Sequence, residues 1–262
     1  MIKEWCRLLW NLFLPRSCAV CGRELLIHEQ HLCLECYAGL PLTYFWNVKE
    51  NPAEVVFWGR TQVERVYSLY FYVNDYRKPI HSLKYKANIG IGIYLGQMLG
   101  KKIATNYNFA KHGKSESNKV SFCNSTPIDF IVPVPLHFRK KWKRGYNQSE
   151  IIAKGILKGI AAEYSIPQII PNLLKRSHFT RTQTQKDRIH RWHNVADAFE
   201  INLRWLRKIQ TEKIQTEHGS HTPHILLIDD VLTTGATLEA CCNILHKHIN
   251  CKISIATLAY VE

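Results

Sequence analysis

Residues 224–242 read HILLIDDVLTTGATLEACC and form the most informative stretch of this sequence. The apolar run over residues 224–228 predicts a buried strand, and the acids Asp229 and Asp230 follow it directly. A short loop containing Gly235 then leads into a predicted helix over residues 237–248. Strand, turn and helix in this order are the unit from which parallel α/β sheets are built.

The loop after the two acids has the composition of an anion site. Backbone amides of a glycine-containing turn before a helix form a nest that suits a phosphate. Adjacent carboxylates would repel that phosphate, so Asp229 and Asp230 are expected to accept hydrogen bonds from a cis-diol. A ribose 5-phosphate meets both demands. The residues expected to hold its phosphate are Thr233, Thr234, Gly235, Ala236 and Thr237. The alternative is an Asp-rich turn with threonine helix caps.

The remaining pattern alternates between strands and helices. Strands are predicted over residues 64–73, 128–134 and 252–261, with a weaker one over 168–174. Helices are predicted over 79–103, with a break near Gly90, and over 147–162. This alternation implies a mostly parallel sheet flanked by helices. Residues 41–52 read as a linker, and 105–126 and 201–221 as polar insertions.

Glycines at positions 90, 92 and 96 imitate a dinucleotide-binding loop. Their spacing differs from that of the dinucleotide fingerprint, and no strand–helix–strand context surrounds them. Close packing between helices is the better interpretation.

Two Cys-x-x-Cys pairs, Cys18 with Cys21 and Cys33 with Cys36, are separated by eleven residues. Each pair can aim two thiolates at one ion, and together they complete a tetrahedral sulfur shell typical of Zn²⁺. Four protein ligands leave no open position, so the metal is expected to be structural. Redox-active or unligated thiols are the alternative.

The ends and the cysteine count bear on location. Residues 1–14 carry apolar side chains at helical spacing and are interrupted by Glu4 and Arg7, which is unlike a signal peptide. They are expected to form an amphipathic helix packed on the body, with membrane-surface binding as the alternative. Nine cysteines without a secretory signal indicate the cytoplasm. No apolar run approaches the ~20 residues of a membrane span.

The expected division is a zinc module over residues 1–52 and an α/β domain over 53–262.

The 262-residue chain carries a formal net charge of +14, which suits polyanionic partners. Residues 137–193 alone contain 13 Lys and Arg against 3 Asp and Glu. The excess positive charge is therefore concentrated in about a fifth of the chain.

The string from Asp229 to Thr237 resembles the phosphoribosyl-pyrophosphate (PRPP) motif of type I phosphoribosyltransferases. Two further blocks, IVPVPLHFRKKWKRGYNQSE (131–150) and LKRSHFTRTQTQKDRIHRWHNVADAF (174–199), narrow the resemblance to the ComF competence-protein family. The cysteine pairs and the segment Leu83-Lys84-Tyr85 are also similar to that family. The resemblance covers nearly the whole chain, and the two polar insertions are departures from it.

The resemblance implies a type I phosphoribosyltransferase-like fold that binds PRPP with Mg²⁺. It implies displacement at the ribose C1 carbon, with pyrophosphate as the leaving group and no acceptor named by the sequence. The residues on the implied pyrophosphate side are Val134, Pro135, Leu136, Arg139, Lys140 and Arg144. A mobile hood over the ligand is implied at Arg176, Thr180, Gln183, Arg191 and Asn194, with an ordinary surface helix as the alternative.

A second hypothesis is a binding protein without catalysis. The ComF resemblance also implies natural transformation, in which the basic segment would handle incoming single-stranded DNA with other competence proteins. Phe138, Trp142 and Tyr146 lie between the basic residues, an arrangement suited to stacking on bases. The alternative is that these aromatic side chains pack in the core. Asn147 and Gln148 are equally open between ligand contact and helix capping.

Overall fold

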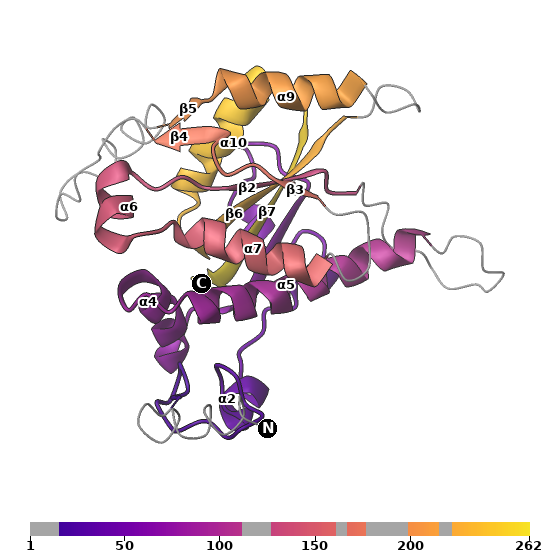
Figure 1. Cartoon of the computed structure of the whole chain (residues 1–262). Coiled ribbons are helices and arrows are strands. Elements are labelled where there is room, and N and C mark those ends of the chain that lie inside the picture. Colours follow the sequence, from indigo (N-terminus) through magenta and orange to yellow (C-terminus); the bar gives the residue numbers. More distant parts are fainter. Residues whose placement is uncertain (1–15, 112–126, 161–166, 177–198, 215–221) are drawn as a thin grey trace, which may run out of the picture.

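The computed structural model describes residues 16–111, 127–160, 167–176, 199–214 and 222–262. A five-stranded sheet forms its centre (Figure 1). Its strands, in spatial order, are β1 (Arg65–Phe71), β7 (Lys252–Tyr260), β6 (His224–Leu232), β2 (Phe130–Pro133) and β3 (Gln168–Ile169). Every neighbouring pair is parallel, so the predicted mostly parallel sheet is confirmed.

The chain reverses its winding direction between β6 and β2, which are neighbours in the sheet. From β6 the chain proceeds to β7, whereas from β2 it proceeds to β3 on the other side. In open parallel sheets, ligands bind outside the carboxyl ends of the strands at such a reversal. The ends of β6 and β2 are therefore the place in this fold where a ligand site is expected.

Helices cover both faces of the sheet (Figure 1). Helices α5 (Ile89–Lys111) and α7 (Gln148–Ile160) share one buried cluster with Leu226 and Ile228 of β6. Helices α9 (Leu203–Ile214) and α10 (Ala236–His248) share a second cluster with Ile225 and Leu227. The alternation along β6 follows from the two-residue period of a strand, and it accounts for the continuous apolar run of that strand.

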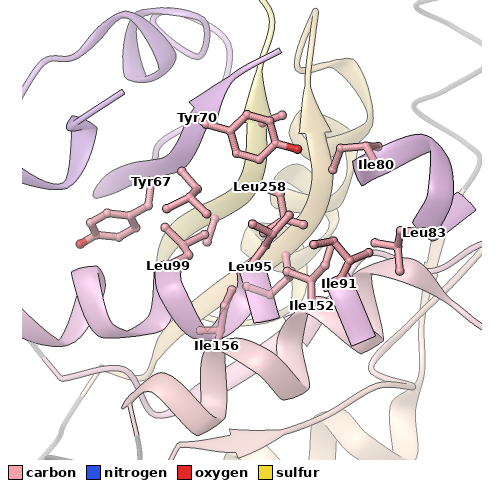
Figure 2. Close-up of a cluster of buried hydrophobic side chains, with 14 of the residues drawn as sticks. Tyr67, Tyr70, Ile80, Leu83, Ile91, Leu95, Leu99, Ile152, Ile156 and Leu258 are labelled. Atoms are coloured by element: carbon pink, nitrogen blue, oxygen red, sulfur yellow. The ribbon is translucent and has the colours of Figure 1, made fainter. Parts of the chain in front are cut away.

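The first cluster is held together by a close approach of α5 and α7. Figure 2 shows Leu95, Leu99, Ile152 and Ile156 of these helices packed under the sheet. A Cβ atom added at Gly96 would lie 2.6 Å from the carbonyl oxygen of Ile152, so the two backbones touch there. The interpretation of this glycine as a packing residue is confirmed.

Three expectations about the chain's organisation need correction. Residues 41–52 are not a free linker, because Phe45 and Trp46 are buried, one in each core cluster. Residues 201–221 are not wholly a polar insertion, since α9 buries Leu206 and Ile209 against the second face. The strand expected over residues 168–174 is two short strands, β3 and β4 (Leu174–Arg176), separated by a turn. Periodicity alone did not reveal these contacts because the partners of these residues lie in distant parts of the chain.

The smaller elements surround the sheet. The break expected near Gly90 is confirmed, since α4 (Lys78–Tyr85) ends before α5 begins. Strand β4 pairs antiparallel with β5 (Phe199–Ile201) beside the sheet. The remaining elements are α2 (Leu34–Ala38), η1 (Phe45–Asn47), α3 (Pro52–Val55), η2 (Asn74–Arg77) and α6 (Phe138–Arg144).

The predicted N-terminal helix lies outside the described residues. Within the part of the chain that the structure describes, none of the helices combines the length and the apolar character needed to cross a bilayer.

Candidate functional site

Strand β6 carries the acidic pair to the carboxyl edge of the sheet and is followed by residues 233–237, which are three connecting residues and the first two residues of α10 and are here called the β6–α10 loop. Gly235 caps α10 in the left-handed conformation, with φ of 73°, which a residue with a side chain rarely adopts. A Cβ atom at Gly235 would lie 2.8 Å from Val56 Cγ1. Glycine is therefore required at this position for two reasons, the backbone conformation and the close packing of the neighbouring segment.

Asp230 of β6 forms an ion pair with a lysine of helix α4. Its Oδ2 atom lies 2.9 Å from Nζ of Lys84, a residue of α4, and both side chains are largely shielded from solvent. An ion pair in such a position is less screened than one on the open surface. The structure thus places a cation directly on the acidic pair.

Asp229 is surrounded by hydrogen-bond donors. Its Oδ1 atom accepts from the Ser149 hydroxyl at 3.1 Å and from the backbone N–H of Asp230 at 2.9 Å. Burial, followed by the charge of Asp230, raises the pKa of Asp229 to about 7, although Lys84 and the two donors act in the opposite direction. Asp229 therefore changes charge close to neutral pH, where a polar ligand or a cation can shift its protonation.

Two cations act directly on this acidic pair, Lys84 of α4 on Asp230 and Arg176 of β4 on Asp229, and both lie near Lys140 of α6. Partial desolvation, then the charges of Arg176, Arg144 and Lys84, lower the pKa of Lys140. Desolvation also lowers the pKa of Arg176, while the charge of Asp229 raises it. Because these charges act on one another, the cations of α4, α6 and β4 converge on the same region. Such a cluster suits a ligand with several negative charges.

The segment after β2 lies beside the end of β6. The backbone N–H of Val134 donates to the carbonyl oxygen of Ile228 at 2.8 Å. The Asn147 side chain holds this segment from the other side, donating to the Val134 carbonyl oxygen at 2.9 Å. Its Oδ1 atom accepts from the Ser149 N–H at 3.2 Å, so Asn147 caps α7. The structure favours the capping interpretation for this residue.

The structure brings together predicted residues that are far apart in the sequence. Asp229, Asp230, the β6–α10 loop and Val134-Pro135-Leu136 lie at adjoining strand ends. Arg176 at the end of β4 reaches the electrostatic environment of Asp229. Arg139 lies on the exposed side of α6. The other hood residues, Thr180, Gln183, Arg191 and Asn194, are outside the described residues.

Two site residues were not identified from the sequence. Lys84 lies in the segment Leu83-Lys84-Tyr85, which the family resemblance singled out without a role. Ser149 lies two residues after the Asn147 cap, and its alignment with Asp229 depends on how α7 packs on β6. No sequence pattern predicts either contact.

Helix α6 presents aromatic side chains to solvent. Trp142 is 90% exposed and Phe138 is 66% exposed, so the expectation that these aromatics could pack in the core is wrong for both. Tyr146 is partly buried, and its hydroxyl donates to the Leu83 carbonyl oxygen. Helix α6 therefore carries basic and apolar aromatic side chains together on an open surface.

The four predicted ligand cysteines converge in the N-terminal part of the chain. The sulfur atoms of Cys18, Cys21, Cys33 and Cys36 all lie within 4.8 Å of one another. Tetrahedral Zn²⁺ with Zn–S bonds of about 2.3 Å requires sulfur atoms roughly 3.8 Å apart. The Cys21 and Cys33 sulfurs are 3.8 Å apart. The donor set and its spacing are compatible with a structural zinc site.

The local backbone favours the thiolate form of Cys18. Burial raises the pKa of Cys18, but backbone N–H groups of Cys33, Cys21 and Val20 outweigh it and lower the pKa to about 6. Amides directed at a sulfur favour its charged form. The segment that carries these cysteines also contacts η2, in the chain after β1, where the Tyr76 hydroxyl donates to the Cys36 carbonyl oxygen at 3.3 Å.

Comparison with known proteins finds relatives that carry one of two names. The chain is 29% identical over 117 residues to Competence protein F of Haemophilus influenzae, covering 45% of this chain and 44% of that protein. It is 24% identical over 231 residues to DNA utilization protein YhgH of Escherichia coli K12, covering 88% of this chain and 84% of that protein. For YhgH of Salmonella typhimurium the identity is 25% over 238 residues. No protein-family model matches the chain. These relatives confirm the resemblance to the ComF family.

Proposed function

We propose that this protein binds PRPP or a related ribose 5-phosphate at the carboxyl ends of β6 and β2. The observation that carries the proposal is the meeting of three features at one edge. These are an acidic pair, a loop whose Gly235 caps helix α10, and a group of cations from α4, α6 and β4. They lie where the chain reverses its winding direction, the usual ligand position in open parallel sheets.

Each part of the ligand has a chemically matched group. The ribose diol donates to the carboxylates of Asp229 and Asp230, and the 5-phosphate accepts from the amides and hydroxyls of the β6–α10 loop. Pyrophosphate is neutralised by Lys84, Lys140, Arg144 and Arg176. The basic residues identified from the sequence and the cation on α4 thus act on the same group.

The same arrangement supports a type I phosphoribosyltransferase-like fold and reaction. In that reaction an acceptor forms a bond to ribose C1 while the bond from C1 to the pyrophosphate oxygen breaks. Pyrophosphate then leaves with the electron pair. The protein contributes positioning of the sugar and neutralisation of the leaving group. Carboxylate oxygens are suitable ligands for Mg²⁺, and Asp229 and Asp230 would hold it together with the ligand's oxygens.

The test begins with binding. Titration calorimetry with PRPP, in the presence and absence of Mg²⁺, is expected to give saturable heat that Asp229→Asn with Asp230→Asn abolishes. Pyrophosphate release with a panel of amine and base acceptors then separates a transferase from a binding protein. Binding without turnover leaves the ligand assignment standing and removes the reaction. Absence of binding to the wild-type protein overturns the proposal.

A second candidate function is handling of single-stranded DNA during competence and DNA uptake. It is favoured by the solvent exposure of Trp142 and Phe138 among the basic residues of α6. Backbone phosphates bind basic side chains, and exposed rings stack on bases. The names of the relatives, Competence protein F and DNA utilization protein, point to the same process in those proteins.

This candidate is tested by fluorescence anisotropy with labelled oligonucleotides over a range of salt concentrations. Affinity for single-stranded DNA that falls steeply with salt is expected, because binding releases counterions from the strand. Undetectable or salt-independent binding would remove it.

We also propose that Cys18, Cys21, Cys33 and Cys36 hold a structural Zn²⁺ ion. Metal analysis of the purified protein is expected to give one zinc per chain, and Cys33→Ser is expected to lower zinc content and melting temperature together. Cys251→Ser is the matched control, because Cys251 lies away from the cluster. A protein without stoichiometric zinc would contradict the assignment.

A further inference from the structure

Arg60 forms several hydrogen bonds around the β6–α10 loop, although it belongs to none of the sequence motifs. It lies just after α3, far from the loop in the chain, and its Nη1 atom donates to the carbonyl oxygen of Thr234 at 2.9 Å. The same nitrogen donates to the Val56 carbonyl oxygen at 2.9 Å. One guanidinium group therefore joins the loop to the segment that packs against it.

The other side of this guanidinium group holds a carboxylate of α10. Arg60 Nε and Nη2 lie 3.1 Å and 2.5 Å from the same Oε2 atom of Glu239. Both side chains are well shielded, with 22% and 15% of their surface exposed. Glu239 sits in the first turn of α10, where its charge stabilises the helix but would repel an anion at the helix start.

The segment that carries Arg60 is itself firmly anchored. Asn51 caps α3, accepting from the Ala53 N–H at 3.1 Å. Glu54 of α3 forms a buried ion pair with Arg65 of β1, with Nε and Oε1 2.9 Å apart. Arg60 is thus fixed to the sheet by contacts that do not involve the loop, and it can hold the loop against a rigid support.

We propose that Arg60 is a positioning residue for phosphate binding: it fixes Thr234 in the β6–α10 loop and cancels the charge of Glu239. This inference rests on the proposed function, because it assigns the loop to the phosphate of a ribose 5-phosphate. The role assigned to Arg60 is indirect, because its hydrogen bonds to Thr234, Val56 and Glu239 act on the loop and on α10. Arg60 affects the ligand by positioning the backbone amides of the loop and by making the local electrostatic potential less negative.

The experiment measures ribose 5-phosphate binding to the full-length protein by titration calorimetry. Arg60→Ala is expected to weaken binding about tenfold, because it frees the loop and leaves the carboxylate uncompensated. Arg60→Ala with Glu239→Gln is expected to recover to within about threefold of the wild type, because the repulsion is gone. Arg204→Ala removes an exposed arginine of α9 and is expected to bind as the wild type does.

Two results would overturn the inference. One is wild-type affinity in Arg60→Ala, and the other is a double variant that binds as weakly as Arg60→Ala alone. Hydrogen exchange of the amides of residues 233–237 supplies a readout without ligand. Faster exchange is expected there in Arg60→Ala, with unchanged exchange in β1 and β7, and unchanged loop exchange would also overturn the inference. If the wild-type protein binds no ribose 5-phosphate, the proposed function fails while the exchange experiment still decides whether Arg60 orders the loop.

Discussion

The two sides of the candidate site are built in opposite ways. On the β6 side, Asp229 and Gly235 are held by hydrogen bonds and close packing from α7 and from residues 56–57. On the α6 side, Trp142 and Phe138 extend into solvent from a short helix. The first side has one arrangement ready for a small ligand, whereas the second can adapt to a flexible chain.

This difference indicates which function each side can serve. A shielded acidic pair, with a raised pKa at Asp229, can discriminate between ligands, because polar groups left without a partner are costly. Exposed rings and cations bind many sequences with little discrimination, because every base has a stacking face. The predictions below test whether the two sides act as separate sites.

The largest effect is expected on the β6 side. Asp229→Asn with Asp230→Asn should weaken ribose 5-phosphate binding by about a hundredfold, because an amide replaces each acceptor of a charge-assisted hydrogen bond. Titration calorimetry measures the loss, and the circular dichroism spectrum controls for folding. Affinity for single-stranded DNA should stay the same. A parallel loss of both affinities would show that the two sides form one site.

The next effect concerns the rings of α6. Trp142→Ala should weaken binding of single-stranded DNA by about tenfold, because a stacked base contributes ~1–3 kcal/mol. Tyr44→Ala is the matched control, since Tyr44 is an exposed aromatic residue outside α6. Fluorescence anisotropy at fixed salt provides the measurement. Equal affinities for Trp142→Ala and the wild type would remove the stacking role.

A smaller effect is expected from the charges of α6. Lys143→Ala should reduce the slope of log affinity against log salt by about 1, if its ammonium group contacts one phosphate of the strand. Ribose 5-phosphate binding should change less than about twofold, because the charge of Lys143 is exposed and screened by salt. A reduced ribose 5-phosphate affinity with an unchanged salt slope would assign Lys143 to the small-ligand site instead.

The smallest effect concerns the pH dependence of stability. Burial and Asp230 raise the pKa of Asp229 from 3.8 to about 7. The folded protein then keeps a proton that the unfolded chain releases, so this residue's contribution is favourable below pH 3.8 and is lost as pH rises to about 7. The melting temperature of Asp229→Asn should therefore rise relative to that of the wild type as the pH increases from 4 to 8. Melting curves that keep a constant difference between the two proteins from pH 4 to pH 8 would contradict this.

Much of the fold could be predicted from local pattern. The runs at residues 224–228 and 252–261 are apolar because strands covered on both faces need apolar side chains on both sides. The cysteine spacing predicted the cluster around Cys18 because each Cys-x-x-Cys turn has its own geometry. Residues 41–52 were misread as a linker because Phe45 and Trp46 find their partners only in distant strands.

The candidate site shows the same distinction between local pattern and long-range contacts. The sequence by itself determined the groups within one segment, namely Asp229, Asp230 and the glycine-capped loop, because a strand–turn–helix unit brings near neighbours together. Only the tertiary structure decided that Lys84 pairs with Asp230 and that Arg60 holds Thr234. These contacts join elements whose relative positions are set by sheet order and helix packing. Such long-range pairs leave no periodic pattern in a single sequence.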